Sequence, residues 1–209
     1  MKKWILIAAL ALLASAASAQ VTALPKPNMK HKTLKVMQAL AERKSIREYS
    51  PRMLKDQDLS DLLWAAGGVS RPDGRLTAPT AQNKQEIRLF VFTAEGVSEY
   101  LPQTNQLKFC VKGDYRKMVA ANQDFAAAAP LSLVIVADIG LFGADNPRAP
   151  MLGAFDAGIV SENINIYCAA AGLATVTRAT MDAAGIQKLL GLSETQLPLL
   201  NNPVGYLVK

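Results

Sequence analysis

Three cations and a hydroxyl group occur within five consecutive positions: Arg43, Lys44, Ser45 and Arg47. Guanidinium and ammonium groups suit a phosphate dianion, and arginine can bind one through two parallel hydrogen bonds. The Ser45 hydroxyl can add a further donor. The alternative is a solvated helix end, where cations are favourable because of the helix dipole. This cluster therefore predicts either an anion site or an ordinary basic surface.

A second stretch with suitable chemistry lies in residues 67–85. This segment has no hydrophobic period and holds three glycines and two prolines, which predicts a long loop. The small residues around Pro79 would let the backbone approach a flat ligand closely. Asn83 and Gln85 carry amides, which both donate and accept hydrogen bonds, as the edge of a heterocycle requires. An ordinary polar loop remains the alternative interpretation.

The first 19 residues have the features of an export signal. Lys2 and Lys3 precede an apolar run, and Ala17-Ser18-Ala19 is a typical cleavage site, so we expect the mature chain to start at Gln20. The apolar run is too short for a comfortable membrane span. We expect an exported protein without a membrane span, periplasmic if the source is Gram-negative. Loss of the two lysines lowers the net charge from +6 to +4.

The charge and cysteine patterns narrow the possible functions. The cations are scattered, without a stripe that alternates with aromatic residues, so nucleic acid is not an expected partner. Only one histidine, His31, is present, and no CxxC motif, which gives no support to a metal site. Cys110 and Cys168 could pair in an exported chain, but Cys168 lies in an apolar helical segment where a free thiol behaves as a small hydrophobe.

The remaining pattern predicts one α+β domain, residues 33–209, after an extended arm, residues 20–32. Helical periodicity predicts helices at 33–42, 56–67, 114–129, 151–171 and 182–190. Branched and aromatic runs predict strands at 87–93, 97–101, 106–111, 131–137 and 203–208, with 173–182 extended. The mixture of helices and hairpins favours an antiparallel-rich sheet flanked by helices. Residues 151–171 are apolar nearly all round, which is typical of a helix in the core or at a dimer interface.

Three stretches together resemble the FMN-dependent nitroreductase family. Residues 43–47 resemble its Arg-x-Ser-x-Arg/Lys motif, and residues 78–85 are similar to its Ala-Pro-Ser-x-x-Asn-x-Gln loop. Residues 171–182 are similar to the Gly-Leu-Gly-Thr segment that follows the family's long helix. Their order and spacing also match, over residues 33–208. The sequence departs from the family at Glu86-Ile87, where Pro-Trp is frequent.

The resemblance implies a nitroreductase-like fold, a homodimer and bound FMN. It assigns the FMN phosphate and part of the flavin to Arg43, Lys44, Ser45 and Arg47. It places Pro79, Thr80, Ala81 and Asn83 against the flavin, often that of the partner subunit. Backbone N–H groups of Thr177, Arg178 and Ala179 would lie near the flavin N5 edge, with positive charge from Lys84 or Arg178. Asn122 matches an amide that binds the flavin pyrimidine, or is a solvated helix residue.

The implied activity is electron transfer through the flavin. A reduced nicotinamide, NAD(P)H, or another donor would supply hydride, and a nitroaromatic, a quinone or a similar flat small molecule would accept it. No separate catalytic acid–base pair is expected, because the cofactor carries the redox chemistry. Two alternatives remain open. Residues 113–116, after the hairpin, resemble the SagB-like dehydrogenase branch, which would act on a heterocycle. The chain could also be an exported, non-enzymatic protein that binds flavin or another anionic ligand.

Overall fold

A seven-stranded antiparallel sheet forms the centre of the computed structural model, which describes residues 20–30, 33–143 and 145–208. The strand order is β1-β4-β3-β2-β5-β7-β6, and every pair is antiparallel. The α+β fold expected from the sequence is therefore confirmed. The predicted export signal, residues 1–19, lies outside the described residues, as does His31.

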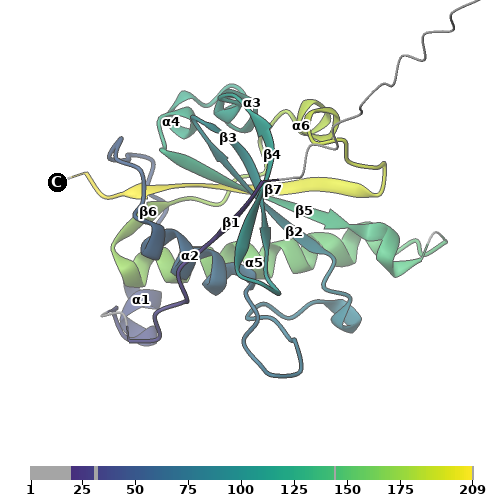
Figure 1. The fold of residues 1–209 in the computed structure, drawn as a ribbon, viewed down its shortest axis with the longest axis horizontal. Helices are drawn as coiled ribbons and strands as arrows, with labels where there is room; N and C mark the ends of the chain where they lie inside the picture. Colours follow the sequence, from purple (N-terminus) through teal and green to yellow (C-terminus); the bar gives the residue numbers. More distant parts are fainter. Residues whose placement is uncertain (1–19, 31–32, 144, 209) are drawn as a thin grey trace, which may run out of the picture.

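The elements follow one another in a simple order (Figure 1). The strands are β1 (Val21–Ala23), β2 (Ile87–Thr93), β3 (Gly96–Leu101), β4 (Gln106–Lys112), β5 (Leu131–Asp138), β6 (Leu173–Thr175) and β7 (Gln196–Tyr206). The helices are α1 (Val36–Glu42), α2 (Asp56–Gly67), α3 (Arg116–Ala120), α4 (Asp124–Ala127), α5 (Ala149–Ala171) and α6 (Ala183–Leu189). Two short 3-10 helices are η1 (Ala81–Asn83) and η2 (Ile139–Phe142).

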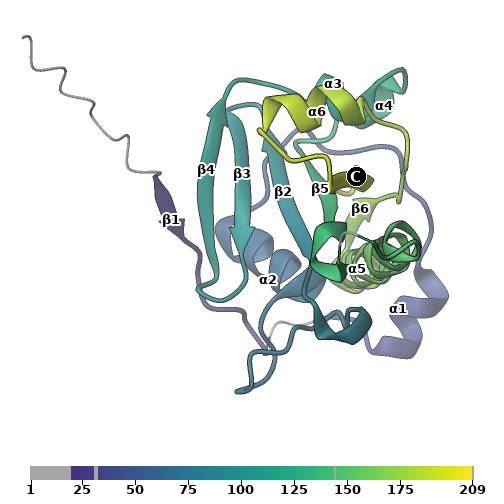
Figure 2. The same ribbon diagram turned by 90° about the vertical axis from the view of Figure 1, so that its right-hand side faces the viewer.

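The helices cover both faces of the sheet. Helices α2 and α5 lie on one face, with α1 beside α5, whereas α3, α4 and α6 lie on the other (Figures 1 and 2). Alternate residues of β2 enter separate cores: Leu89 and Val91 pack toward α2 and α5, and Phe90 and Phe92 toward α3 and α6. Strand β5 is buried on both faces, which explains its mostly apolar sequence, with Ser132 as a buried polar residue.

Helix α5 is the longest element and carries much of the first core. Its 23 residues span about 35 Å. At Gly153 the helix lies so close to the sheet that an added Cβ would come within 2.9 Å of the Ala137 Cβ and of Ile139. Gly172 ends the helix with a φ of 71°, a left-handed conformation that glycine adopts at little cost.

Several predicted elements are correct and three need correction. Strand β2 has the predicted bounds, and the β3–β4 hairpin and α2 are also found. The predicted helix 114–129 is wrong, because Ala121 has a φ of 52° and divides the segment into α3 and α4. The last strand starts seven residues earlier than predicted, at Gln196. The first helix starts three residues later than predicted, at Val36, and its apolar residues are exposed apart from Ala39.

The predicted arm, of which the structure describes residues 20–30, contributes an edge strand. Val21–Ala23 pairs with β4, and the Phe109 N–H donates to the Gln20 carbonyl at 2.8 Å. The Pro25 carbonyl accepts hydrogen bonds from Ser60 and Asn105. The arm is thus fixed to the sheet and to α2.

Both cysteines are free, Cys110 exposed on β4 and Cys168 buried in α5, so the disulfide alternative is wrong. Across the described ranges, no group of three or more His, Cys, Asp or Glu side chains is arranged to hold a metal ion. No helix in the same ranges is both long enough and apolar enough to cross a membrane.

Candidate functional site

Helix α5 contacts all three stretches that the sequence singled out. The Arg43 guanidinium lies 4.0 Å from the Glu162 carboxylate on α5. The Thr177 hydroxyl binds Ser161, and the Ala81 N–H donates to Asp156. The helix is therefore the scaffold that positions the stretches relative to one another.

A buried polar network attaches α5 to the third stretch and to β7. The hydroxyl oxygens of Ser161 and Thr177 are 2.6 Å apart, and Ser161 donates to Asn202 at 2.8 Å. The Asn165 amide donates to Thr177 at 2.9 Å, and the Asn202 amide donates to the Asn165 oxygen at 3.2 Å. Buried amides require such partners, so the network determines how the segment around Thr177 leaves the sheet.

The first and third stretches meet at a hollow of about 430 Å³. Its lining consists of Arg47, Gln123, Phe125, Val176, Thr177, Arg178 and Thr180. The guanidinium groups of Arg47 and Arg178 lie 5.7 and 5.6 Å from the centre of the Phe125 ring. Two cations and an aromatic ring thus border one open space. An anionic, flat ligand would find complementary charge here.

Arg178 is a buried cation held by neutral oxygens. Its guanidinium donates to Gln123, to Asn201 and to the carbonyls of Val119 and Ala120 at 2.6–3.0 Å. Burial lowers the pKa of this guanidinium, but arginine remains protonated. The side chain joins the α3–α4 junction to β7 and contributes positive charge to the hollow without itself being exposed.

Free backbone donors border the same hollow. The Arg178 N–H is bonded to the Asn201 carbonyl at 2.8 Å, so it cannot act as the donor that the resemblance implies. Thr177 and Ala179 are exposed, and among the described residues no acceptor faces their N–H groups. These two positions therefore keep the donor capacity that Arg178 lacks.

The Arg43–Arg47 cluster follows α1 as an exposed extended segment. The Ile46 N–H donates to the Thr175 carbonyl at 2.9 Å, which places the cluster beside β6. Arg43, Lys44, Ser45 and Arg47 are all exposed. Lys44 also lines a second, larger hollow of about 820 Å³ between α1 and the end of α5. The cations are therefore available to a ligand, with Arg43 only loosely paired.

The second stretch approaches a different face of α5. Asp156, which binds the Ala81 N–H at 2.7 Å, is nine residues from Asn165 in the network described above. At 3.6 residues per turn, nine residues place the two side chains about half a turn apart and about 14 Å apart along the axis. Within one subunit, the first and third stretches therefore lie together, and the second stretch lies on another side of α5.

The turn of the second stretch has an unusual backbone. Gln82, Asn83 and Gln85 have φ values of 55°, 54° and 50°, and left-handed residues other than glycine cost on the order of 1 kcal/mol each. The Gln85 N–H donates to the Thr80 hydroxyl at 2.8 Å. Asn83 and Pro79 are exposed. The turn is held from within and through Asp156.

The residue next to a predicted amide, Gln123, lines the hollow. Asn122 is exposed at the break between α3 and α4, whereas Gln123 is half-buried and accepts from Arg178 at 2.8 Å. The sequence does not single out Gln123, because the helical pattern over 114–129 gives no sign of the break at Ala121. The break at Ala121 changes the direction of every following side chain.

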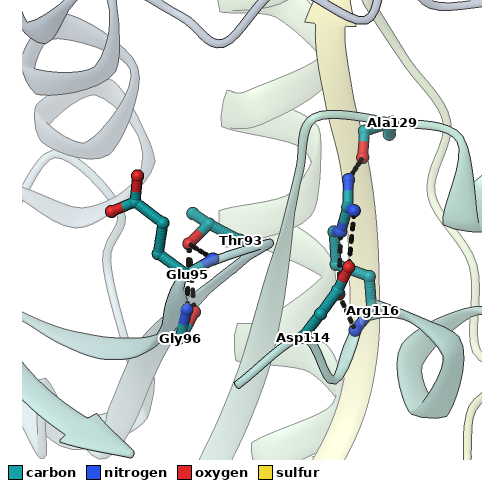
Figure 3. Close-up of polar contacts among 6 residues, drawn as sticks. All are labelled: Thr93, Glu95, Gly96, Asp114, Arg116 and Ala129. Atoms are coloured by element: carbon teal, nitrogen blue, oxygen red, sulfur yellow. Dashed lines mark hydrogen bonds and ion pairs between the residues drawn. The ribbon is translucent and has the colours of Figure 1, made fainter. Parts of the chain in front are cut away.

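Residues 113–116 form a local clamp near this site (Figure 3). Arg116 donates to both carboxylate oxygens of Asp114, at 2.9 and 2.6 Å, and to the Ala129 carbonyl at 3.0 Å. The Arg116 side chain lowers the pKa of Asp114. Figure 3 also shows Thr93 accepting from the N–H groups of Glu95 and Gly96 in the β2–β3 turn. The clamp fastens the start of α3 to the start of β5, so its visible role is structural.

Comparison with known proteins decides the family. The model of the nitroreductase family matches residues 40–206, which include all three stretches. This chain belongs to the nitroreductase family. A crystal structure described as that of a nitroreductase from Ralstonia eutropha is 34% identical, with a TM-score of 0.84 and 90% of each chain covered.

One further relative is similar in sequence, and one further structure is similar in fold. A protein of Methanocaldococcus jannaschii that bears the name nitroreductase is 29% identical over 185 residues, which are 82% of this chain and 91% of the relative. A structure from Parabacteroides distasonis, described as an NADH dehydrogenase or NAD(P)H nitroreductase, is 17% identical with a TM-score of 0.59. The match covers 83% of this chain and 88% of the other chain. At this identity it supports the fold alone.

Proposed function

We propose that this nitroreductase-family oxidoreductase binds FMN and transfers electrons from a reduced nicotinamide, or another donor, to a nitroaromatic, quinone or similar flat acceptor. The observation that carries the proposal is the hollow bordered by Arg47, Phe125 and Arg178, with the unpaired N–H groups of Thr177 and Ala179 beside it. When bound, the flavin would supply the redox chemistry, and the protein would bind and orient it.

The donor set fits a flavin mononucleotide. Exposed Arg43, Lys44 and Arg47 offer charge-assisted hydrogen bonds to a phosphate, with Ser45 as a further donor. The Gln123 amide and the free N–H groups would hold the polar edge of a heterocycle. Arg178 would favour the extra negative charge of a reduced ring through the electrostatic field of a fixed cation. Asn122 would contribute only if its exposed side chain turned toward the ligand.

A homodimer would complete the site. Pro79, Thr80, Ala81 and Asn83 lie on a different face of α5 from the cations, so in our proposal they cover the flavin of the partner subunit. Exposed apolar residues on α5 and α1 offer an interface. They are Met151, Phe155, Ile159, Val36, Met37 and Leu40. On α5, Met151, Phe155 and Ile159 are spaced four residues apart, so they form one stripe along the helix.

We also propose that the mature chain starts at Gln20 and acts in an exported compartment. The first hydrogen bond of β1 uses the Gln20 carbonyl, so cleavage after Ala19 would leave the strand intact. The test is expression with the full leader, cell fractionation and intact mass of the product. A cytoplasmic protein that retains Met1–Ala19 would contradict this part of the proposal.

The deciding experiment is an absorbance spectrum of the purified mature protein, with and without added FMN, followed by anaerobic NADH. A flavin spectrum that bleaches is the expected result. If dithionite bleaches the bound flavin but NADH does not, either the electron donor is not a nicotinamide or the protein is a flavin carrier. Absence of flavin binding at saturating FMN would overturn the proposal.

A further inference from the structure

Glu86 is a carboxyl group buried without a donor. It precedes β2, directly after the Thr80–Gln85 turn, and is 1% exposed. Among the described residues, neither of its carboxyl oxygens receives a hydrogen bond. An ionised carboxylate in such a position is disfavoured, because burial removes its hydration.

The neighbour of Glu86 is a second buried acid. Asp156 on α5 is 4% exposed and accepts the Ala81 N–H through one of its oxygens at 2.7 Å. Burial raises the pKa of Glu86 from its usual 4.5 to about 8, Asp156 adds to the increase, and the Thr80 hydroxyl opposes it. Two adjacent carboxyl groups in this setting hold one proton more readily than none.

Among the residues that the structure describes, no cation forms an ion pair with either acid. Among the charged groups of the surrounding elements, Arg88 on β2 binds Glu99, and Asp138 at the end of β5 accepts from Gln196 and Thr195. Lys84 in the turn is exposed. Within the described residues, no ion pair involves Glu86 or Asp156. A shared proton is therefore the remaining way to avoid two buried negative charges.

The pair adjoins the strained turn of the second stretch. Asp156 binds the first residue of η1, and Glu86 follows Gln85, whose N–H binds the Thr80 hydroxyl. Three left-handed residues lie between these attachments. The turn would relax if Asp156 moved, so whatever fixes the Asp156 carboxylate also fixes the turn.

We propose that Glu86 and Asp156 share one proton, and that protonated Glu86 holds Asp156 in place as the acceptor for the Thr80–Gln85 turn. Glu86 is thus a positioning residue, which acts through Asp156 and touches no ligand. Loss of the proton places two repelling charges beneath the turn and releases it. That the released turn would also weaken flavin binding rests on the proposed function; the latch itself does not.

Hydrogen exchange of the Ala81 amide tests the latch directly, without a cofactor. After correction for the intrinsic rate, protection in the wild-type protein should fall about 30-fold between pH 7 and pH 9.5, because the protonated fraction declines about tenfold per unit above a pKa of about 8. In Glu86→Gln, whose amide can donate but not ionise, protection should stay constant over this range. Glu194→Gln, at an exposed site, is the matched control and should follow the wild type.

Infrared spectroscopy gives a second readout that a purely structural role would not move. At pH 7 the wild-type protein should show the band of a protonated carboxyl group. This band should disappear above pH 9 and should be missing from Glu86→Gln. Constant wild-type protection of Ala81, or absence of the band, would overturn the proposal. Because both readouts use the apoprotein, failure to bind FMN would contradict the proposed function and leave the latch result valid.

Discussion

Arg43 and Arg47 show how exposed cations can be placed without an acidic partner close enough to neutralise them. Arg43 reaches Glu162 only at 4.0 Å, with half of the Glu162 side chain exposed, and such pairs contribute little to stability. Arg47 lies against Phe125. Their removal should therefore affect a bound anion far more than the fold.

We expect Arg43→Ala combined with Arg47→Ala to weaken FMN binding by at least about 100-fold, since each charged hydrogen bond contributes about 1.5–3 kcal/mol. The thermal midpoint of the apoprotein should change little. Fluorescence titration with FMN gives the dissociation constant, and Arg75→Ala, an exposed arginine on the 67–85 loop, is the control. Unchanged affinity in the double variant would remove the phosphate assignment.

Asp114 makes a pH-dependent contribution to stability. Because Arg116 lowers its folded pKa, the stabilisation is present above the ordinary value of about 3.9 and is lost as the pH falls through the lower folded value. The Asp114 side chain is 44% exposed, so Asp114→Asn should cost less than about 1 kcal/mol at pH 7. Urea denaturation should show this difference disappearing toward pH 2, and Asp145→Asn, at an exposed site, is the control.

Glu86 has the opposite dependence. Its folded pKa is raised to about 8, so its contribution is complete below about pH 4.5 and is lost as the pH rises toward 8. Thermal melting from pH 5 to pH 9 should show a decline in wild type that Glu86→Gln lacks. A parallel decline in both proteins would mean that another group titrates.

At the scale of elements, α5 joins parts of the site that lie far apart in the chain. Ser161 and Asn165 meet Thr177 and Asn202 in one buried network, and Asp156 holds the turn at Ala81. A helix is suited to this role because its side chains project at fixed angles from one rigid axis. Loss of one member should loosen the segment that lines the hollow.

Asn202→Ala should lower the free energy of unfolding by about 2–4 kcal/mol, because buried partners lose their hydrogen bonds. Asn202 is 0% exposed. Urea denaturation measures the change, and Asn122→Ala, at an exposed position, should be nearly neutral. If the two variants were equally stable, water would be replacing the lost amide, and the network would not determine the path of residues 175–177.

At the scale of the whole molecule, an apolar surface remains exposed on α1 and α5. Phe155 is 59% exposed and Met37 is 76% exposed, and large exposed apolar side chains of this kind are typical of a protein interface. A dimer through this surface would bring the 79–83 turn of one subunit toward the cations of the other.

We expect Phe155→Asp combined with Ile159→Asp to convert a dimer into a folded monomer, since two charges per subunit would be buried in the interface. Light scattering at micromolar concentration measures the mass. Phe109→Asp, at an exposed position on β4, should stay dimeric. A wild-type monomer, or a double variant that remains dimeric, would contradict this interface.

Local patterns were sufficient for elements whose structure depends on neighbouring residues. Residues 87–93 and the β3–β4 hairpin follow from branched and aromatic runs around a turn. The predicted final strand, 203–208, misses residues 196–202, which include Pro198, and proline is unfavourable in strands. In the structure Pro198 lies beside a register shift at Ile135–Val136, whereas Pro203 pairs with Ser132. The left-handed Ala121 has no sequence signal, because alanine favours helix.

The sequence by itself determined the three stretches, the α+β class and the chemical character of the cations, because residue types and short spacings carry that information. Only the tertiary structure decided which groups meet. Gln123 faces Arg178 across 55 residues, and Glu86 lies beside Asp156, 70 residues away in the chain. Such contacts depend on how β2, α5 and the α3–α4 break pack around a common sheet, and burial then changes the acidity of groups that the sequence shows only as ordinary carboxylates.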